Sequence, residues 1–244
     1  MALYSYTKEK VKPQKRLINF ISYSSMIVGS FFLFWSFYPV ISFEIYSYFF
    51  IKNRIFSPVP HSEVVSSLEA ANSILGTYNI LSSNLSDYSN VGVWFPSKPR
   101  IKNDKLRIKE YTLSLPKLNI KDAKVIVDGE DLSKNLVHYL AKSLPGEYGN
   151  VTIFGHSTIP QYYNVNDYKT IFTYLHSLDE GDKIYVEADG ATYEYEVYEM
   201  FIIKPDEISV LDQRYDNAYL TLITCVPPGT YKERLVVRAK LTKL

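Results

Sequence analysis

The sequence predicts a mostly-β domain that follows a single membrane-spanning helix. From residue 106 onward, short segments rich in β-branched and aromatic residues alternate with Gly/Pro turns, which is typical of a β-sandwich or a β-barrel. Aromatic residues make up 15% of the chain, with 22 tyrosines, and such residues favour strands over helices. The length of 244 residues, 46% of them hydrophobic, suffices for one sizeable domain plus appendages.

The overall charge and the cysteine count exclude several classes of protein. With 27 basic and 26 acidic residues the formal charge is +1, so no general attraction to nucleic acid is expected. The single cysteine, Cys225, rules out an internal disulfide and a metal site built from clustered cysteines.

Residues 17–43 form an uncharged apolar run that is predicted to cross the cell membrane once, as a signal-anchor helix. The run is long enough for a hydrocarbon core of about 30 Å. A secretory signal peptide is the rival interpretation, but its apolar region is shorter and precedes a small-residue cleavage site, which this sequence does not offer. Five basic residues precede the run and two follow closely, so residues 1–16 are expected in the cytoplasm and the rest outside.

Residues 44–105 are expected to form an extracytoplasmic stalk. Within it, residues 62–75 place apolar side chains at helical spacing before Gly76, which indicates a short amphipathic helix. Residues 77–104 are rich in Ser, Asn, Tyr and Pro without a clear period. They are therefore interpreted as a linker or as a loop lying on the following domain.

The globular domain is expected to span residues 106–244. Its candidate strands are residues 111–115, 124–127, 151–154, 183–187, 192–201, 219–224 and 234–241. Two helical inserts are predicted between them, at residues 131–143 and 168–178.

Cys225 is the candidate nucleophile, because it ends an apolar strand and precedes a Pro/Gly turn. Only a thiolate attacks, and a free thiol has a pKa of about 8.5, so a histidine or a cation is needed nearby. Among the four histidines, His156 is the best candidate, since it follows a strand and a glycine. His61 and His176 are interpreted as structural. The alternative for Cys225 itself is a packing role.

An arginine is the natural group to stabilise the negative charge that develops on a carbonyl oxygen under attack. Arg234 and Arg238 share one face of a predicted strand, so parity alone does not choose between them. Arg234 lies next to the turn that leaves Cys225, which favours it. The alternative for either side chain is a solvated strand arginine.

The residues around the cysteine resemble a known family. Residues 221–225, Thr-Leu-Ile-Thr-Cys, are similar to the Thr-Leu-x-Thr-Cys signature of the sortases, membrane-anchored cysteine transpeptidases of bacterial cell surfaces. Further matches follow in family order at residues 115–120, 144–157, 172–175, 181–184 and 234–238. The resemblance implies a closed sortase-type β-barrel of about eight strands with short helices over residues 106–244.

The same resemblance implies a role for individual residues. Cys225 is the implied nucleophile, His156 the acid/base group and Arg234 the group that binds the oxyanion and orients the substrate. The implied substrate contacts are Thr224, Ser157 and Ile223. His138 falls where many members have a second histidine outside the catalytic three, and it is expected to pack next to the site in a helix, with its ring hydrogen-bonded.

The implied reaction is a transpeptidation. The thiolate attacks a C-terminal sorting signal of a surface protein, a Leu-Pro-x-Thr-Gly-like pentapeptide cleaved after Thr, and an amine from a peptidoglycan precursor or a pilin lysine then accepts the acyl group. Some members bind calcium near the substrate groove, where Glu147 and the acidic residues at 128–131 would contribute, but no metal and no cofactor are predicted.

The subclass rests on weaker signals. Pilin-polymerising members commonly have an N-terminal lid with an Asp-Pro-aromatic motif and a second membrane segment, whereas here the sequence ends after its last strand and offers only Asp87-Tyr88. Cell-wall anchoring is therefore the first choice and pilin polymerisation the second. Alternatives from other classes are a catalytically silent peptide-binding barrel and a different cysteine peptidase, such as an L,D-transpeptidase, whose Ser-x-Gly-Cys pattern is absent.

Overall fold

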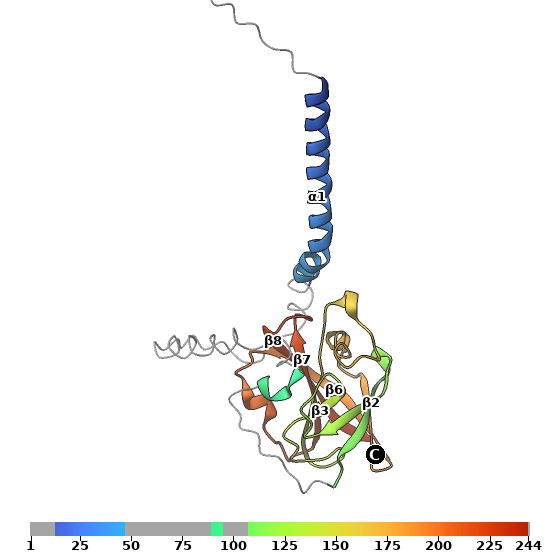
Figure 1. Cartoon of the computed structure of the whole chain (residues 1–244). Helices are drawn as coiled ribbons and strands as arrows, with labels where there is room; N and C mark the ends of the chain where they lie inside the picture. Colours follow the sequence, from blue (N-terminus) through green and yellow to red (C-terminus); the bar gives the residue numbers. More distant parts are fainter. Residues whose placement is uncertain (1–12, 47–88, 95–106, 244) are drawn as a thin grey trace, which may run out of the picture. The chain divides into compact units, whose positions relative to one another are not determined.

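The computed structural model describes residues 13–46, 89–94 and 107–243, in two units that are treated separately (Figure 1). The first unit contains one helix, α1, Pro13–Tyr46. Its segment Leu17–Tyr38 has a mean hydropathy of 1.7 and side chains that are not buried, so it fits a membrane anchor by length and composition. The helix extends past the predicted run at both ends. The predicted helix at residues 62–75 and His61 lie outside the described residues.

The second unit is a closed barrel of eight strands, which confirms the predicted fold (Figure 1). The strands are β1 Glu110–Leu115, β2 Ile120–Val127, β3 Leu136–His138, β4 Gly149–Phe154, β5 Lys183–Ala188, β6 Ala191–Ile203, β7 Ala218–Val226 and β8 Glu233–Lys243. Their order around the barrel is β1-β2-β3-β4-β7-β8-β6-β5. The short 3-10 helix η3 Val91–Val93 precedes β1, and four others lie between strands, namely η4 Pro116–Leu118, η5 Pro160–Tyr162, η6 Leu175–Ser177 and η7 Ile208–Leu211.

Strand direction determines which loops meet at one end of the barrel. β4 and β7 are parallel neighbours, paired from Gly149↔Ala218 to Phe154↔Ile223, so their C-terminal ends lie side by side. β8 runs antiparallel to β7 and therefore begins at the same end. The residues that follow β4 and β7 and those that open β8 are consequently gathered in one place.

The two predicted helical inserts are wrong in type. Residues 131–143 form turns around β3, whose three residues are all buried, and residues 168–178 form turns that end in η6. A short apolar run buried on both sides has no period that distinguishes a strand from a helix. The apolar side of the second insert is as predicted, since Ile171, Phe172, Leu175 and Leu178 all pack in the barrel core.

Successive residues along a strand pack alternately in two apolar clusters. Along β7, Leu220, Leu222 and Val226 belong to the cluster that fills the barrel interior, to which all eight strands contribute. Ile223 and Cys225 point to the opposite face and belong to a second cluster outside the barrel. We call this second surface the outward face.

Two segments outside the barrel strands cover the outward face. Residues 89–94 precede the expected domain start at residue 106, and they are tied to the barrel by main-chain hydrogen bonds from Leu132 N to Ser89 O and from Val91 N to Glu130 O. Val91 and Trp94 complete the outer cluster from this side. Val210 and Leu211 of η7 complete it from the connection between β6 and β7.

Candidate active site

Strand pairing brings the three predicted catalytic residues to one end of the barrel. Cys225 on β7 is directly paired with Arg234 on β8. On its other side β7 pairs with β4, and the last pair of that ladder is Phe154↔Ile223. Continued by two residues, this register places His156 beside Cys225, and hydrogen bonds from Gly155 N to Ile223 O and from Thr224 Oγ1 to Gly155 O support it.

Cys225 is buried, with 2% of its surface exposed. Burial raises the pKa of its thiol to about 11, because a thiolate loses its hydration there, while the positive charge of Arg234 acts in the opposite direction. The thiol is therefore protonated at neutral pH in this conformation. A reaction partner can reach this buried thiol only if part of the cover moves away.

His156 is neutral in the same conformation. Burial lowers the pKa of its imidazole to about 4, and the nearby carboxylates of Asp131 and Asp167 only partly oppose this effect. A neutral imidazole is able to accept a proton. The resting site thus combines an uncharged thiol with an uncharged base.

Arg234 is 3% exposed and is held by the turn between β7 and β8. Its Nη1 donates to the carbonyls of Tyr231 and Glu233, at 3.1 and 3.2 Å. Its Nε is buried without a hydrogen-bond partner among the described residues. Arg238, on the same face, is instead ion-paired with Glu199 at 3.0 Å. The contacts of the two arginines therefore differ, although their alternation along the strand is the same.

Trp94 is the residue that the sequence analysis missed. It is fully buried, and its ring centroid lies 5.1 Å from the Arg234 guanidinium carbon and 5.5 Å from the centroid of the His156 ring. It also meets Phe154 edge-on at 5.6 Å. The tryptophan thereby links two of the candidate catalytic side chains. The signal that would have indicated it is an apolar Val-Gly-Val-Trp sequence inside a polar segment.

Replacing Trp94 with alanine is expected to increase the reactivity of Cys225 toward iodoacetamide at neutral pH, by about tenfold, because loss of the indole admits water and lowers the thiol pKa. The rate is followed by intact-protein mass spectrometry. Trp94→Phe, which retains an aromatic ring, is the matched control and should react more slowly than Trp94→Ala. Equal rates in wild type and Trp94→Ala would show that the indole does not protect the thiol.

Two of the predicted substrate contacts, Ile223 and Thr224, lie on opposite faces of β7, and the third, Ser157, follows β4. Ile223 shares the outward face with Cys225, although it is completely buried. Ser157 is closer to the nucleophile, since its Oγ donates to the carbonyl of Cys225 at 2.7 Å. Thr224 lies on the opposite face, where its hydroxyl donates to Gly155 O, and this position does not favour a role in lining a groove.

His138 lies in strand β3 rather than in a helix and is fully buried. It shares its face with Leu136, which belongs to the barrel interior, so it faces away from the outward face. Its ring centroid lies 5.9 Å from that of Tyr111, and neither ring nitrogen has a hydrogen-bond partner among the described residues. The expected hydrogen-bonded ring next to the site is therefore not observed.

The burial of His138 predicts lower stability in acid. Burial lowers the pKa of its ring to about 3, from an ordinary value of 6.5. Between these values the unfolded chain binds a proton that the folded chain does not, so stability falls as the pH drops below about 6.5. We expect the melting temperature to fall less between about pH 7 and pH 5 in His138→Phe than in wild type. His156 and His176, whose pKa values are also lowered by burial, act in the same direction in both proteins.

The acidic residues considered as calcium ligands accept hydrogen bonds from main-chain N–H groups. Glu147 accepts a hydrogen bond from Leu144 N, Asp128 from Ala141 N and Asp131 from Ser133. Among the described residues, no group of three or more His, Cys, Asp or Glu side chains is placed to hold a metal ion.

Comparisons with known proteins identify relatives of this chain. A sequence model of the Sortase domain matches residues 113–242. Sortase D of Bacillus subtilis is 26% identical over 132 residues, which cover 52% of this chain and 61% of that protein. Sortase A of Listeria monocytogenes is 35% identical over 95 residues, which cover 39% of each. The chain therefore matches less than two thirds of the length of these curated relatives.

Solved structures show the same fold. Sortase C-1 of Actinomyces oris has a TM-score of 0.50 at 24% identity, over 72% of this chain and 98% of that chain. Sortase C-1 of S. pneumoniae has a TM-score of 0.51 at 22% identity, over 74% and 92%. Members of this family generally need no cofactor, and calcium is optional. Because the family match spans more than half of the 244 residues and falls on the barrel that carries Cys225, the chain belongs to the sortase family.

Proposed function

We propose that this chain is a membrane-anchored cysteine transpeptidase that cleaves a C-terminal sorting signal of surface proteins and transfers the acyl group to an amine. The observation that carries the proposal is the register of β4, β7 and β8, which supports a site composed of Cys225, His156 and Arg234. A nucleophile, a neutral base and a fixed cation are the groups that acyl transfer through a thioester requires.

The proposed reaction starts when the donor peptide displaces the cover. His156 takes the proton of the Cys225 thiol, and the thiolate adds to the scissile carbonyl carbon. The resulting oxyanion is stabilised by the Arg234 guanidinium, whose Nε has no partner among the described residues. His156 then returns its proton to the leaving amine as the C–N bond breaks, which leaves a thioester on Cys225.

The second half of the reaction regenerates the enzyme. An incoming amine attacks the thioester carbonyl, His156 removes the excess proton from the nitrogen, and the sulfur leaves as a thiolate that is reprotonated. Water is the competing acceptor and would give hydrolysis. A site that excludes water until the substrates are bound favours transfer over hydrolysis.

We further propose that α1 anchors residues 106–244 outside the cytoplasm, with residues 1–16 inside, since the basic residues precede the apolar run. Enzyme and membrane-bound substrate would then share one membrane face at a high effective concentration. The proposed partners are surface proteins with a sorting signal and an amine acceptor. A peptidoglycan precursor is our first choice of acceptor.

Polymerisation of pilin subunits through a lysine is the second candidate. It is favoured by one observation, the cover that residues 89–94 place over the site through Trp94, because an N-terminal lid is what resemblance to pilin-polymerising sortases implies. The described part of the cover lacks an Asp-Pro-aromatic motif.

The test is a cleavage assay with Leu-Pro-x-Thr-Gly peptides, in which x is varied, in the presence and absence of an amine acceptor. We expect cleavage after Thr, a thioester on Cys225 detectable by intact mass, and more product transfer as the amine concentration rises. Hydrolysis without transfer would indicate a peptidase. Binding without turnover would indicate a silent peptide-binding barrel. Triglycine and a pilin-type lysine peptide as competing acceptors would separate the two candidate functions.

A further inference from the structure

The outward face continues away from Cys225 along two neighbouring strands. By alternation, Thr221 of β7 and Asn150 of β4 lie on the same face as Cys225. Thr221 is four positions from Cys225 along β7, and Asn150 is paired with Tyr219, which is six positions from Cys225. The connection between β6 and β7 crosses this part of the face, because Val210 and Leu211 pack in the same cluster as Cys225. Residues 208–213 thus form a wall beside the face that carries the nucleophile.

Residues 208–213 are not paired with a strand. The side-chain carboxamides of Asn150 and Gln213 bind this wall to the barrel instead. Gln213 pairs with the main chain of Asn150 in both directions: Asn150 N donates to its Oε1 and its Nε2 donates to Asn150 O, each at 2.9 Å. The Asn150 side chain reaches back, with Nδ2 donating to the carbonyls of Val210 and Asp212 at 3.2 and 3.4 Å. We call this pair of residues the amide latch.

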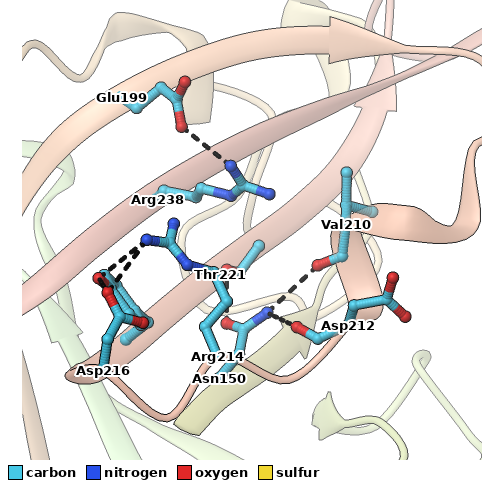
Figure 2. Close-up of polar contacts among 9 residues, drawn as sticks. Asn150, Glu199, Val210, Asp212, Arg214, Asp216, Thr221 and Arg238 are labelled. Atoms are coloured by element: carbon cyan, nitrogen blue, oxygen red, sulfur yellow. Dashed lines mark hydrogen bonds and ion pairs between the residues drawn. The ribbon is translucent and has the colours of Figure 1, made fainter.

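The amide latch is itself fixed by the barrel. Asn150 is only 5% exposed, and its Oδ1 accepts a hydrogen bond of 2.7 Å from Thr221 Oγ1 (Figure 2). In the figure its amide nitrogen points to the Val210 and Asp212 carbonyls and its oxygen to Thr221. Both polar ends of the side chain are therefore used. Asn150 also begins an Asn-x-Thr sequence, but this engaged and buried amide is not available for glycosylation.

We propose that Asn150 and Gln213 are positioning residues for the donor peptide, because they tie the segment of Val210 and Leu211 to β4, and these two side chains pack in the apolar cluster of the outward face that also contains Cys225. This inference rests on the proposed function of the site. The groups that perform the chemistry are positioned by other means: Cys225 and Arg234 by the β7–β8 ladder, and His156 by the continuation of β4. Loss of the amide latch should therefore weaken donor binding and leave the chemical step intact.

The test compares Gln213→Ala and Asn150→Asp with Arg214→Ala in the full chain. Arg214 adjoins the latch in sequence but is ion-paired with Asp216 (Figure 2). It also donates to the Tyr219 hydroxyl, so it is the matched control. We expect the KM for the Leu-Pro-x-Thr-Gly donor to rise about tenfold in both latch variants with kcat within about twofold, which corresponds to the loss of one or two buried hydrogen bonds. Gln213→Glu, which keeps the acceptor for Asn150 N, should recover part of the affinity.

A second measurement separates this inference from the function on which it rests. Binding of the same peptides is measured in the Cys225→Ala background with and without Gln213→Ala, so no turnover is needed. If the wild-type protein binds the donor peptide but does not cleave it, the proposed function fails. The latch is still tested, because the peptide affinities of Cys225→Ala with and without Gln213→Ala can be compared. Three outcomes would overturn the proposal. They are an unchanged KM and peptide affinity in the latch variants, a loss of activity that is confined to kcat, and the absence of peptide binding in every protein.

Discussion

Cys225→Ala is expected to abolish both cleavage and transfer, with a loss of at least about 10³-fold in kcat, because a thioester needs a thiol and Cys225 is the only cysteine in the sequence. The substitution removes one buried sulfur and is not expected to prevent folding. The measurement is product formation by chromatography, together with the intact mass of the protein after incubation with peptide. Wild type should gain the acyl mass, and Cys225→Ala should not.

Two controls make this result specific to the nucleophile. The melting temperature of Cys225→Ala should stay within a few degrees of wild type, and the variant should still bind the donor peptide. Cys225→Ser tests the thiolate directly, since a hydroxyl of the same shape is far harder to ionise and should also be nearly inactive. Transfer that persists in a folded Cys225→Ala protein would rule out the proposed mechanism.

Arg234→Ala is expected to lower kcat/KM by about 10² to 10³-fold, because the oxyanion would lose its only charged donor among the described residues close to Cys225. Arg234→Lys keeps the charge but not the planar set of donors held by the Tyr231 and Glu233 carbonyls, so it should recover only part of the rate.

Arg238→Ala is the matched control for Arg234. It removes the same side chain from the same strand and face, but one that is paired with Glu199 and packs over Phe201. We expect kcat/KM to change less than about threefold, with a modest loss of stability. If both variants lost activity equally, the assignment of Arg234 as the oxyanion group would be wrong.

Several features were readable from local pattern. All seven predicted strands occur in the barrel, because each alternates between two faces or forms an apolar run bounded by turn residues. The missing eighth strand, β3, has only three residues and exists because it pairs with β2 and β4. Such a strand depends on pairing partners elsewhere in the chain, so the local sequence pattern does not predict it.

The sequence by itself determined the apolar helix, the barrel class, the family and the identity of the candidate nucleophile, since composition, spacing and motif order are local properties of the chain. Only the tertiary structure showed that Arg238 is ion-paired with Glu199, placed Thr224 away from the outward face, and revealed Trp94 and the Asn150–Gln213 latch. These contacts join side chains that are 39 or more residues apart in the chain. Long-range packing decides such contacts, and a single sequence does not record it.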